Sequence, residues 1–128
     1  MKRAIFTFYN LSLDTDIVRL QAEVVKKFNT TADFLPLCSE THGEEVIHPD
    51  AVDYGFNQLF VEQKYDTVLL LDVDCIPLNA YALEYTFEQA EKGKLIGNVQ
   101  RGMHLDNDEH NYVAPSAFCL TRQMYEDF

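Results

Sequence analysis

Residues 67–74 read TVLLLDVD, a continuous strand-like run that ends in two aspartates. Five successive residues without alternation between polar and apolar side chains are typical of a strand covered on both faces in the centre of a parallel sheet. Such a strand needs packed layers on both sides, which helices supply in α/β proteins. The stretch therefore predicts an α/β fold with this strand near its middle.

The segments around this strand alternate between strand patterns and helix patterns. We expect further strands over residues 3–8, 33–37, 95–99 and 112–120. We expect helices over residues 15–28, from Pro49 to Gln63, over 79–92, and after a capping Thr121. This order predicts one domain over residues 1–128, an open, mainly parallel, Rossmann-like sheet flanked by helices, with ligands at the carboxyl ends of the strands.

Within two of these helices, the spacing of apolar residues predicts the face that packs on the sheet. The apolar residues of the first helix are Ile17, Leu20, Val24 and Phe28. Those of the 79–92 helix are Ala80, Leu83, Phe87 and Ala90, and Gly93 ends that helix. The charged segment over residues 100–111 is expected to be a long loop.

The composition narrows the possible partners. The net charge is −11 and no run of Lys or Arg occurs, which argues against nucleic acid. No apolar stretch is long enough to span a bilayer. The three cysteines are far apart and form no CxxC pair, so we expect reduced thiols and a cytoplasmic location.

The two aspartates after the central strand are the strongest chemical signal. Asp72 and Asp74 are spaced i, i+2, so they share one face and can address one ion. Ionised carboxylates at the end of a buried strand are costly unless a cation, basic groups or water balance them. Oxygen ligands of this kind suit Mg²⁺ or Mn²⁺, which keep positions free for phosphate and water. The alternative is that they cap the next helix or end the strand in solvent.

Residues 64–79, KYDTVLLLDVDCIPLN, resemble the DxD region of glycosyltransferases with the GT-A fold. The resemblance covers nearly the whole chain and implies a nucleotide-diphospho-sugar transferase that transfers a hexose-like sugar to a glycan, lipid or protein acceptor. It implies that Asp74 binds Mn²⁺ or Mg²⁺ directly, and that Asp72 contacts the metal through water or binds the ribose of the donor. Family members usually continue further, so it also implies that the usual C-terminal portion is lacking.

The same resemblance implies a place for the nucleotide and the sugar. The base would lie against the end of the first strand, where Thr7, Tyr9 and Asn10 are candidate contacts, whereas Phe8 is better read as a core residue. Asn57 and Lys64 are further candidates for holding the nucleotide. On the 112–120 strand, the small residues Ala114, Ser116 and Ala117 would let the sugar approach, with Ser116 donating a hydrogen bond; plain packing is the alternative.

The charged segment over residues 100–111 supplies the remaining candidates. Asp106, Asp108 and Glu109 are candidate general bases toward an acceptor hydroxyl in an inverting reaction. Arg101 is a candidate partner for phosphate, and His104 or His110 for the metal shell. The alternative for each is a solvated acidic connection.

Two other functions compete with the transferase. In a haloacid-dehalogenase-like phosphohydrolase, Asp72 would be the nucleophile and Asp74 the general acid. That family has its motif near the N-terminus and needs later Lys and acidic motifs, whereas this motif begins after about half of the chain. The other competitor is a non-catalytic nucleotide-sugar-binding module that keeps the fold without turnover.

Overall fold

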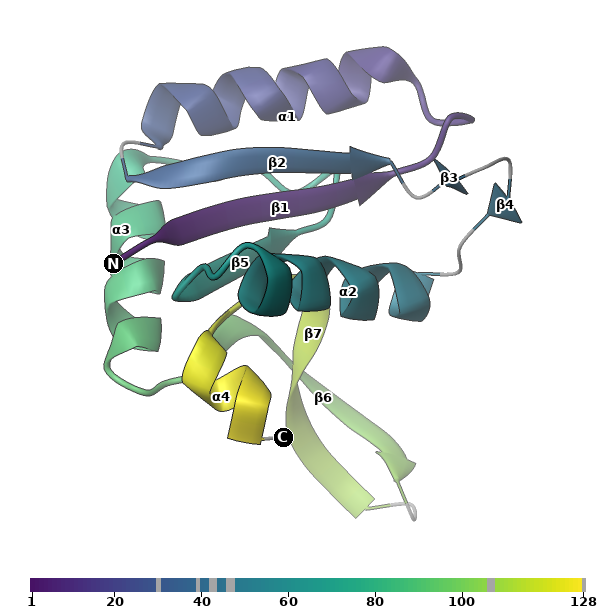
Figure 1. The fold of residues 1–128 in the computed structure, drawn as a ribbon. Helices are drawn as coiled ribbons and strands as arrows, with labels where there is room; N and C mark the ends of the chain where they lie inside the picture. Colours follow the sequence, from purple (N-terminus) through teal and green to yellow (C-terminus); the bar gives the residue numbers. More distant parts are fainter. Residues whose placement is uncertain (30, 39, 42–43, 46–47, 106–107, 128) are drawn as a thin grey trace.

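A computed structural model describes residues 1–29, 31–38, 40–41, 44–45, 48–105 and 108–127. Its centre is a five-stranded sheet in the order β2-β1-β5-β7-β6 (Figure 1). The strands of this sheet are β1 (Arg3–Tyr9), β2 (Ala32–Cys38), β5 (Thr67–Leu71), β6 (Ile96–Leu105) and β7 (Asp108–Thr121). A separate antiparallel pair is formed by β3 (Glu40–Thr41) and β4 (Glu44–Glu45). The helices are α1 (Thr15–Phe28), α2 (His48–Asn57), the π-helical turn η1 (Gln58–Glu62), α3 (Ala80–Glu91) and α4 (Arg122–Asp127).

The strand that carries the aspartates lies in the middle of the sheet, as predicted. All five residues of β5 are buried, with β1 parallel on one side and β7 on the other. β2, β1 and β5 pair in parallel as expected, whereas β7 runs antiparallel to both β5 and β6. The sheet is therefore open and mixed, and the α/β class is confirmed.

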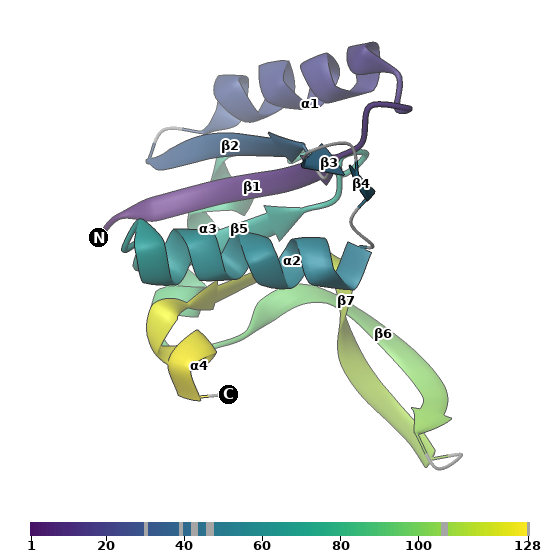
Figure 2. The same cartoon turned by 45° about the vertical axis from the view of Figure 1, so that its right-hand side comes forward.

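The expected loop over residues 100–111 is part of a β-hairpin instead. β6 continues to Leu105 and β7 begins at Asp108, and Figures 1 and 2 show their paired ends projecting away from the helices. Gln100, Arg101, Glu109 and Asn111 of this hairpin are exposed, and its sequence lacks the apolar alternation that identifies a half-buried strand. For this reason the local sequence predicts a loop over residues 100–111 and not a hairpin.

Helices cover both faces of the sheet. Successive strand residues point to opposite faces, so neighbouring residues of one strand belong to different cores. Phe6 and Leu70 belong to the core on the side of α2, η1 and α4. Ile5 and Leu69 belong to the core on the side of α1 and α3. Figure 1 shows the two helical layers on either side of the strands. No helix within the described residues is long and apolar enough to cross a membrane.

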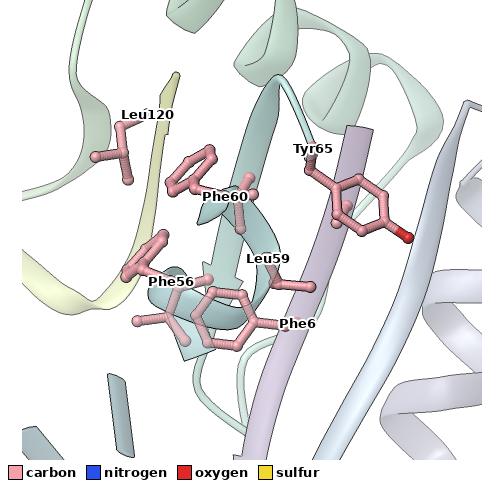
Figure 3. Packing of buried hydrophobic residues seen from close by; sticks show 9 residues of the cluster. Phe6, Phe56, Leu59, Phe60, Tyr65 and Leu120 are labelled. Carbon is pink, nitrogen blue, oxygen red and sulfur yellow. The ribbon is translucent and has the colours of Figure 1, made fainter. Parts of the chain in front are cut away.

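Aromatic rings dominate the core beneath α2 (Figure 3). The ring of Phe60 stacks on that of Phe56 with centroids 5.7 Å apart, and its centroid lies 5.2 Å from that of Tyr125. At the edge of this core, the Tyr65 hydroxyl donates a 2.6 Å hydrogen bond to Asp33. Burial, and then this carboxylate, raise the pKa of Tyr65 to about 12. Tyr65 therefore stays a neutral donor that ties the start of β5 to β2.

Helix α1 has the predicted bounds but packs through a different face. Its buried residues are Gln21 and Val25, whereas the side chain of Leu20 is 56% exposed. The prediction followed apolar residues alone and so omitted a glutamine on the inward side. In α3, Leu83 and Phe87 are buried as expected, but Ala80 is exposed because it is the first helical residue, next to the capping Asn79.

Helix α2 crosses β1 at Gly55, where a side chain has no room. A Cβ at this position would lie 2.6 Å from Cε2 of Phe6 and 2.8 Å from Cζ of Phe8. We expect Gly55→Val to lower the free energy of unfolding by about 1–2 kcal/mol, because overpacking costs about 1–3 kcal/mol and improved helix propensity offsets about 0.5 kcal/mol of it. Urea unfolding measures this difference. Asp53→Val adds the same side chain at an exposed site of α2 and should change stability by less than about 0.5 kcal/mol; equal losses in the two variants would contradict the close contact.

Candidate functional site

The chain makes a tight turn over residues 72–75 directly after β5. The N–H of Cys75 donates to the carbonyl of Asp72 at 2.8 Å, which is the i to i+3 bond of a β-turn. The N–H of Asp72 donates to the carbonyl of Ser116 at 2.8 Å and so extends the pairing with β7 by one residue. The turn is thus attached to the sheet where the central strand ends, and it carries both aspartates.

Asp72 and Asp74 line the same pocket, which has a volume of about 320 Å³. Asp72 is half-buried and Asp74 is exposed. The other lining residues are Val73, Phe8 from β1, Leu13 just before α1, and Ile17 in the first turn of α1. The described lining residues include two acids and no base, so the pocket is a site of negative potential with partly apolar walls.

The thiol of Cys75 reports the charge of this turn. Its pKa is raised, first by burial and then by the negative charges of Asp72 and Asp74. Burial and the two negative charges therefore disfavour the thiolate of Cys75, which is the form that acts as a nucleophile. The oxygen atoms of the two aspartates remain as the ligands that this turn offers.

These residues fit a hard dication better than a closed structural metal site. Within the described part of the chain, no three His, Cys, Asp or Glu side chains converge to hold an ion. Mg²⁺ is usually held by one or two carboxylates together with water and substrate phosphates. Two carboxylates in one accessible pocket match that arrangement, with the remaining positions open to a phosphate ligand.

Among the candidates at the end of β1, Thr7 lies inside the core. Its side chain is completely buried, and its Oγ1 has no hydrogen-bond partner among the described atoms. It cannot touch a ligand at the surface. Phe8 packs under Gly55 and also lines the pocket, whereas Tyr9 and Asn10 are half-buried and lie outside its lining. Phe8 is therefore a core residue, as predicted, and it also forms part of the pocket wall.

Ser116 is brought next to the aspartates, as expected. Its carbonyl accepts the N–H of Asp72, and its Oγ lies 3.4 Å from Nδ2 of Asn98, which donates to it. Ala114 is buried, and Ala117 pairs with Leu71 at the end of β5. The small residues of β7 therefore lie beside the 72–75 turn.

The candidates in the hairpin are carried away from the pocket. Because β7 is antiparallel to β5, the residues that precede Ser116 extend beyond the end of β5 (Figure 2). His110 lies six residues before Ser116, a contour of about 20 Å at 3.3 Å per residue, and it pairs with Gly102 of β6. His110 therefore lies along the hairpin and not in the lining of the pocket that Asp72 and Asp74 share, and its role as a metal ligand stays a prediction.

The other hairpin candidates follow the same geometry. Arg101 forms an ion pair with Glu109 at 2.5 Å, and both side chains are mostly exposed. Asp108 is the first residue of β7, and His104 belongs to β6. Asp106 lies outside the described residues. The hairpin thus pairs Arg101 with a neighbouring carboxylate instead of presenting it to a ligand at the pocket.

Asn57 and Lys64 also lie away from the pocket. Lys64 has a left-handed backbone, with φ of 59°, and it precedes β5, which is about 17 Å long. It therefore lies near the opposite end of β5 from Asp72. Asn57 is exposed at the end of α2, on the other helical layer from α1.

One residue at the site was missed by the sequence analysis. Gln21 of α1 is buried, and its Nε2 donates to the carbonyls of Asp72 and Cys75, at 2.7 Å each. The only signal in the sequence is a polar residue four positions after Ile17 and four before Val25, on the inward side of the helix.

The structure therefore brings Asp72, Asp74 and Ser116 together and separates them from the hairpin candidates. A second pocket, of about 380 Å³ and mostly apolar, lies between residues 75–79, α3 and the strands β6 and β7. The segment after β5 thus separates an acidic pocket from an apolar one. No protein-family model matches the chain, and no curated protein matches it significantly.

Proposed function

We propose that this chain is a metal-dependent glycosyltransferase domain that binds a nucleoside-diphosphate sugar through Asp72 and Asp74. The observation that carries the proposal is the position of both carboxylates in one pocket at the carboxyl end of the central strand. That edge is where open α/β sheets bind ligands. The resemblance of residues 64–79 to a DxD region adds the class of ligand.

The electrostatics of the pocket support a metal-bound diphosphate. Two ionised carboxylates repel a free diphosphate, and the described lining residues contain no cation to reverse that repulsion. In our proposal Asp74 holds Mn²⁺ or Mg²⁺, and Asp72 orients it through water or binds the ribose. When bound, the ion supplies Lewis-acid stabilisation of the charge on the leaving nucleoside diphosphate. Phe8 and Leu13 form apolar parts of the pocket wall.

In our proposal the sugar lies beside the metal, next to β7. Ser116 and Ala117 lie next to the end of β5, so a sugar attached to the diphosphate can approach β7 closely. Ser116 is half-buried, and its hydroxyl can donate to a sugar hydroxyl. Glu109 lies in the projecting hairpin, so we assign donor binding to the pocket and no general base to Glu109.

Metal-dependent ligand binding tests the proposal. We expect nucleotide-sugars to raise the melting temperature of the wild type in the presence of Mn²⁺, since a ligand at 100 times its Kd adds about 2.7 kcal/mol of stability. Asp74→Asn should lose this increase. Asp53→Asn makes the same change at an exposed site of α2 and should keep it. A panel of nucleotide-sugars that never stabilises the wild type with Mn²⁺ would refute the proposal.

Turnover assays separate the competing functions. Transfer of sugar to an acceptor supports the glycosyltransferase. A trapped aspartyl-phosphate, with phosphatase turnover lost in Asp72→Asn, would replace it with a phosphohydrolase. Metal-dependent binding without transfer or hydrolysis across a panel of acceptors would show a binding module.

A further inference from the structure

A buried amide lies beneath the turn that carries the two aspartates. Gln21 is 1% exposed, and its Nε2 donates to the carbonyl oxygens of Asp72 and Cys75 at 2.7 Å each. These carbonyls belong to the first and last residues of the 72–75 turn. One side chain of α1 therefore joins both ends of a turn that follows it by about fifty residues in the sequence.

The net stability that its hydrogen bonds supply does not by itself account for a glutamine at position 21. Two hydrogen bonds stabilise the fold, but Oε1 of Gln21 is buried without a partner among the described atoms. The cost of an unsatisfied buried acceptor is comparable to the net gain from two hydrogen bonds. An apolar residue of similar length would fill the same space and remove the unpaired Oε1, but it would also remove the donor that the carbonyls of Asp72 and Cys75 share. What the amide adds is a fixed position for the two carbonyls.

The position of those carbonyls affects the aspartates directly. The amino end of the turn is also held by the bond from Asp72 N–H to Ser116, and the turn itself is closed by the bond from Cys75 N–H. Gln21 attaches the Cys75 end to α1, and Asp74 is the residue immediately before it. Asp74 is exposed, so its placement relative to Asp72 depends on how firmly this end is held.

We propose that Gln21 is a positioning residue that holds the 72–75 turn so that Asp72 and Asp74 face one divalent cation. The metal part of this inference rests on the proposed function. The mechanical part, that Gln21 restrains the turn, concerns only atoms of this chain. Binding groups need to be held to well under an ångström, so a loosened turn weakens cation binding without unfolding the protein.

Hydrogen exchange of the Cys75 amide tests the mechanical part. We expect Gln21→Met to speed this exchange about ten-fold or more, because two hydrogen bonds to the turn are lost. The amide of Leu69 in β5 should change much less. Val25→Ala is the matched control, because it removes buried packing one turn further along α1 but leaves the two hydrogen bonds from Gln21 to Asp72 and Cys75 in place. Unchanged Cys75 exchange in Gln21→Met, or an equal local change in Val25→Ala, would overturn the inference.

Calorimetric titration with Mn²⁺ and uridine diphosphate tests the metal part. We expect Gln21→Met to bind at least about ten-fold more weakly than the wild type, at a temperature where circular dichroism shows both proteins folded. Gln21→Asn keeps the amide but is one methylene shorter, so it should weaken binding similarly. This variant takes the place of Gln21→Met if Gln21→Met does not fold. Faster exchange with unchanged binding would overturn the positioning role. A wild type that binds no Mn²⁺ would refute the proposed function and the metal part, while the exchange result still decides whether Gln21 holds the turn.

Discussion

Replacing Phe60 with alanine is expected to lower the free energy of unfolding by about 3–5 kcal/mol, the usual cost of removing a buried phenylalanine. Phe60 is fully buried in η1, and its ring contacts Phe56 and Tyr125. It thus joins η1 to α2 and to α4 beneath the sheet. Because a domain has only about 5–15 kcal/mol of stability, Phe60→Ala should shift the urea midpoint strongly. Equilibrium urea unfolding followed by circular dichroism measures the change.

An exposed aromatic residue on the neighbouring helix provides the control. Tyr54 lies on α2 with 55% of its surface exposed, so Tyr54→Ala removes a ring of similar size with little loss of packing. We expect it to change stability by less than about 1 kcal/mol. If Phe60→Ala cost no more than Tyr54→Ala, the aromatic core of Figure 3 would not be the main support of this face.

Arg3→Met should cost about 3 kcal/mol at neutral pH, at the low end for breaking a buried ion pair by removing one partner. The guanidinium of Arg3 binds Glu91 through two bonds, of 2.6 Å and 2.7 Å, and Glu84 through one of 2.7 Å. The side chains of Arg3 and Glu91 are only 12% and 15% exposed. Methionine fills the space of the arginine stem but leaves the carboxylate of Glu91 without its cation. Urea unfolding at pH 7 measures the loss.

The stability that the Arg3–Glu91 pair supplies should fall as the pH is lowered. The hydrogen bond from Arg3 is the largest influence on the pKa of Glu91 and holds it below its ordinary value of 4.5. A carboxyl group whose pKa is lowered by folding stabilises the protein above its unfolded pKa, and that stability is lost as the pH falls through the folded pKa. The difference between wild type and Arg3→Met should therefore be full at pH 7 and shrink below about pH 4.5. A difference that stays constant down to pH 3 would contradict the pairing.

A second arginine serves as the control for this experiment. Arg19 pairs with Asp16 at 3.0 Å on the surface of α1, and both side chains are at least 70% exposed. Exposed pairs of this kind contribute little, so Arg19→Met should change stability by less than about 0.5 kcal/mol at any pH.

The sequence alone was sufficient for features that depend on short-range pattern. The bounds of β5 and α1 were predicted correctly, because a continuous apolar run and a helical period are visible within a dozen residues. Gly93, with φ of 85°, ends α3 as predicted, because glycine takes a left-handed conformation at low cost. Asp72 and Asp74 were identified in the same way, because they adjoin the buried strand in the chain.

Only the tertiary structure decided which distant residues meet this strand. The direction of β7 was not predictable, since the residues of this strand do not record which strand it pairs with or which way that neighbour runs, and that direction places Ser116 at the site and His110 away from it. Gln21 was missed because its hydrogen-bond partners are backbone carbonyls 51 and 54 residues away, and a carbonyl leaves no mark on the sequence. Local sequence therefore determined the elements and the two acids, whereas the order and direction of the strands determined what surrounds them.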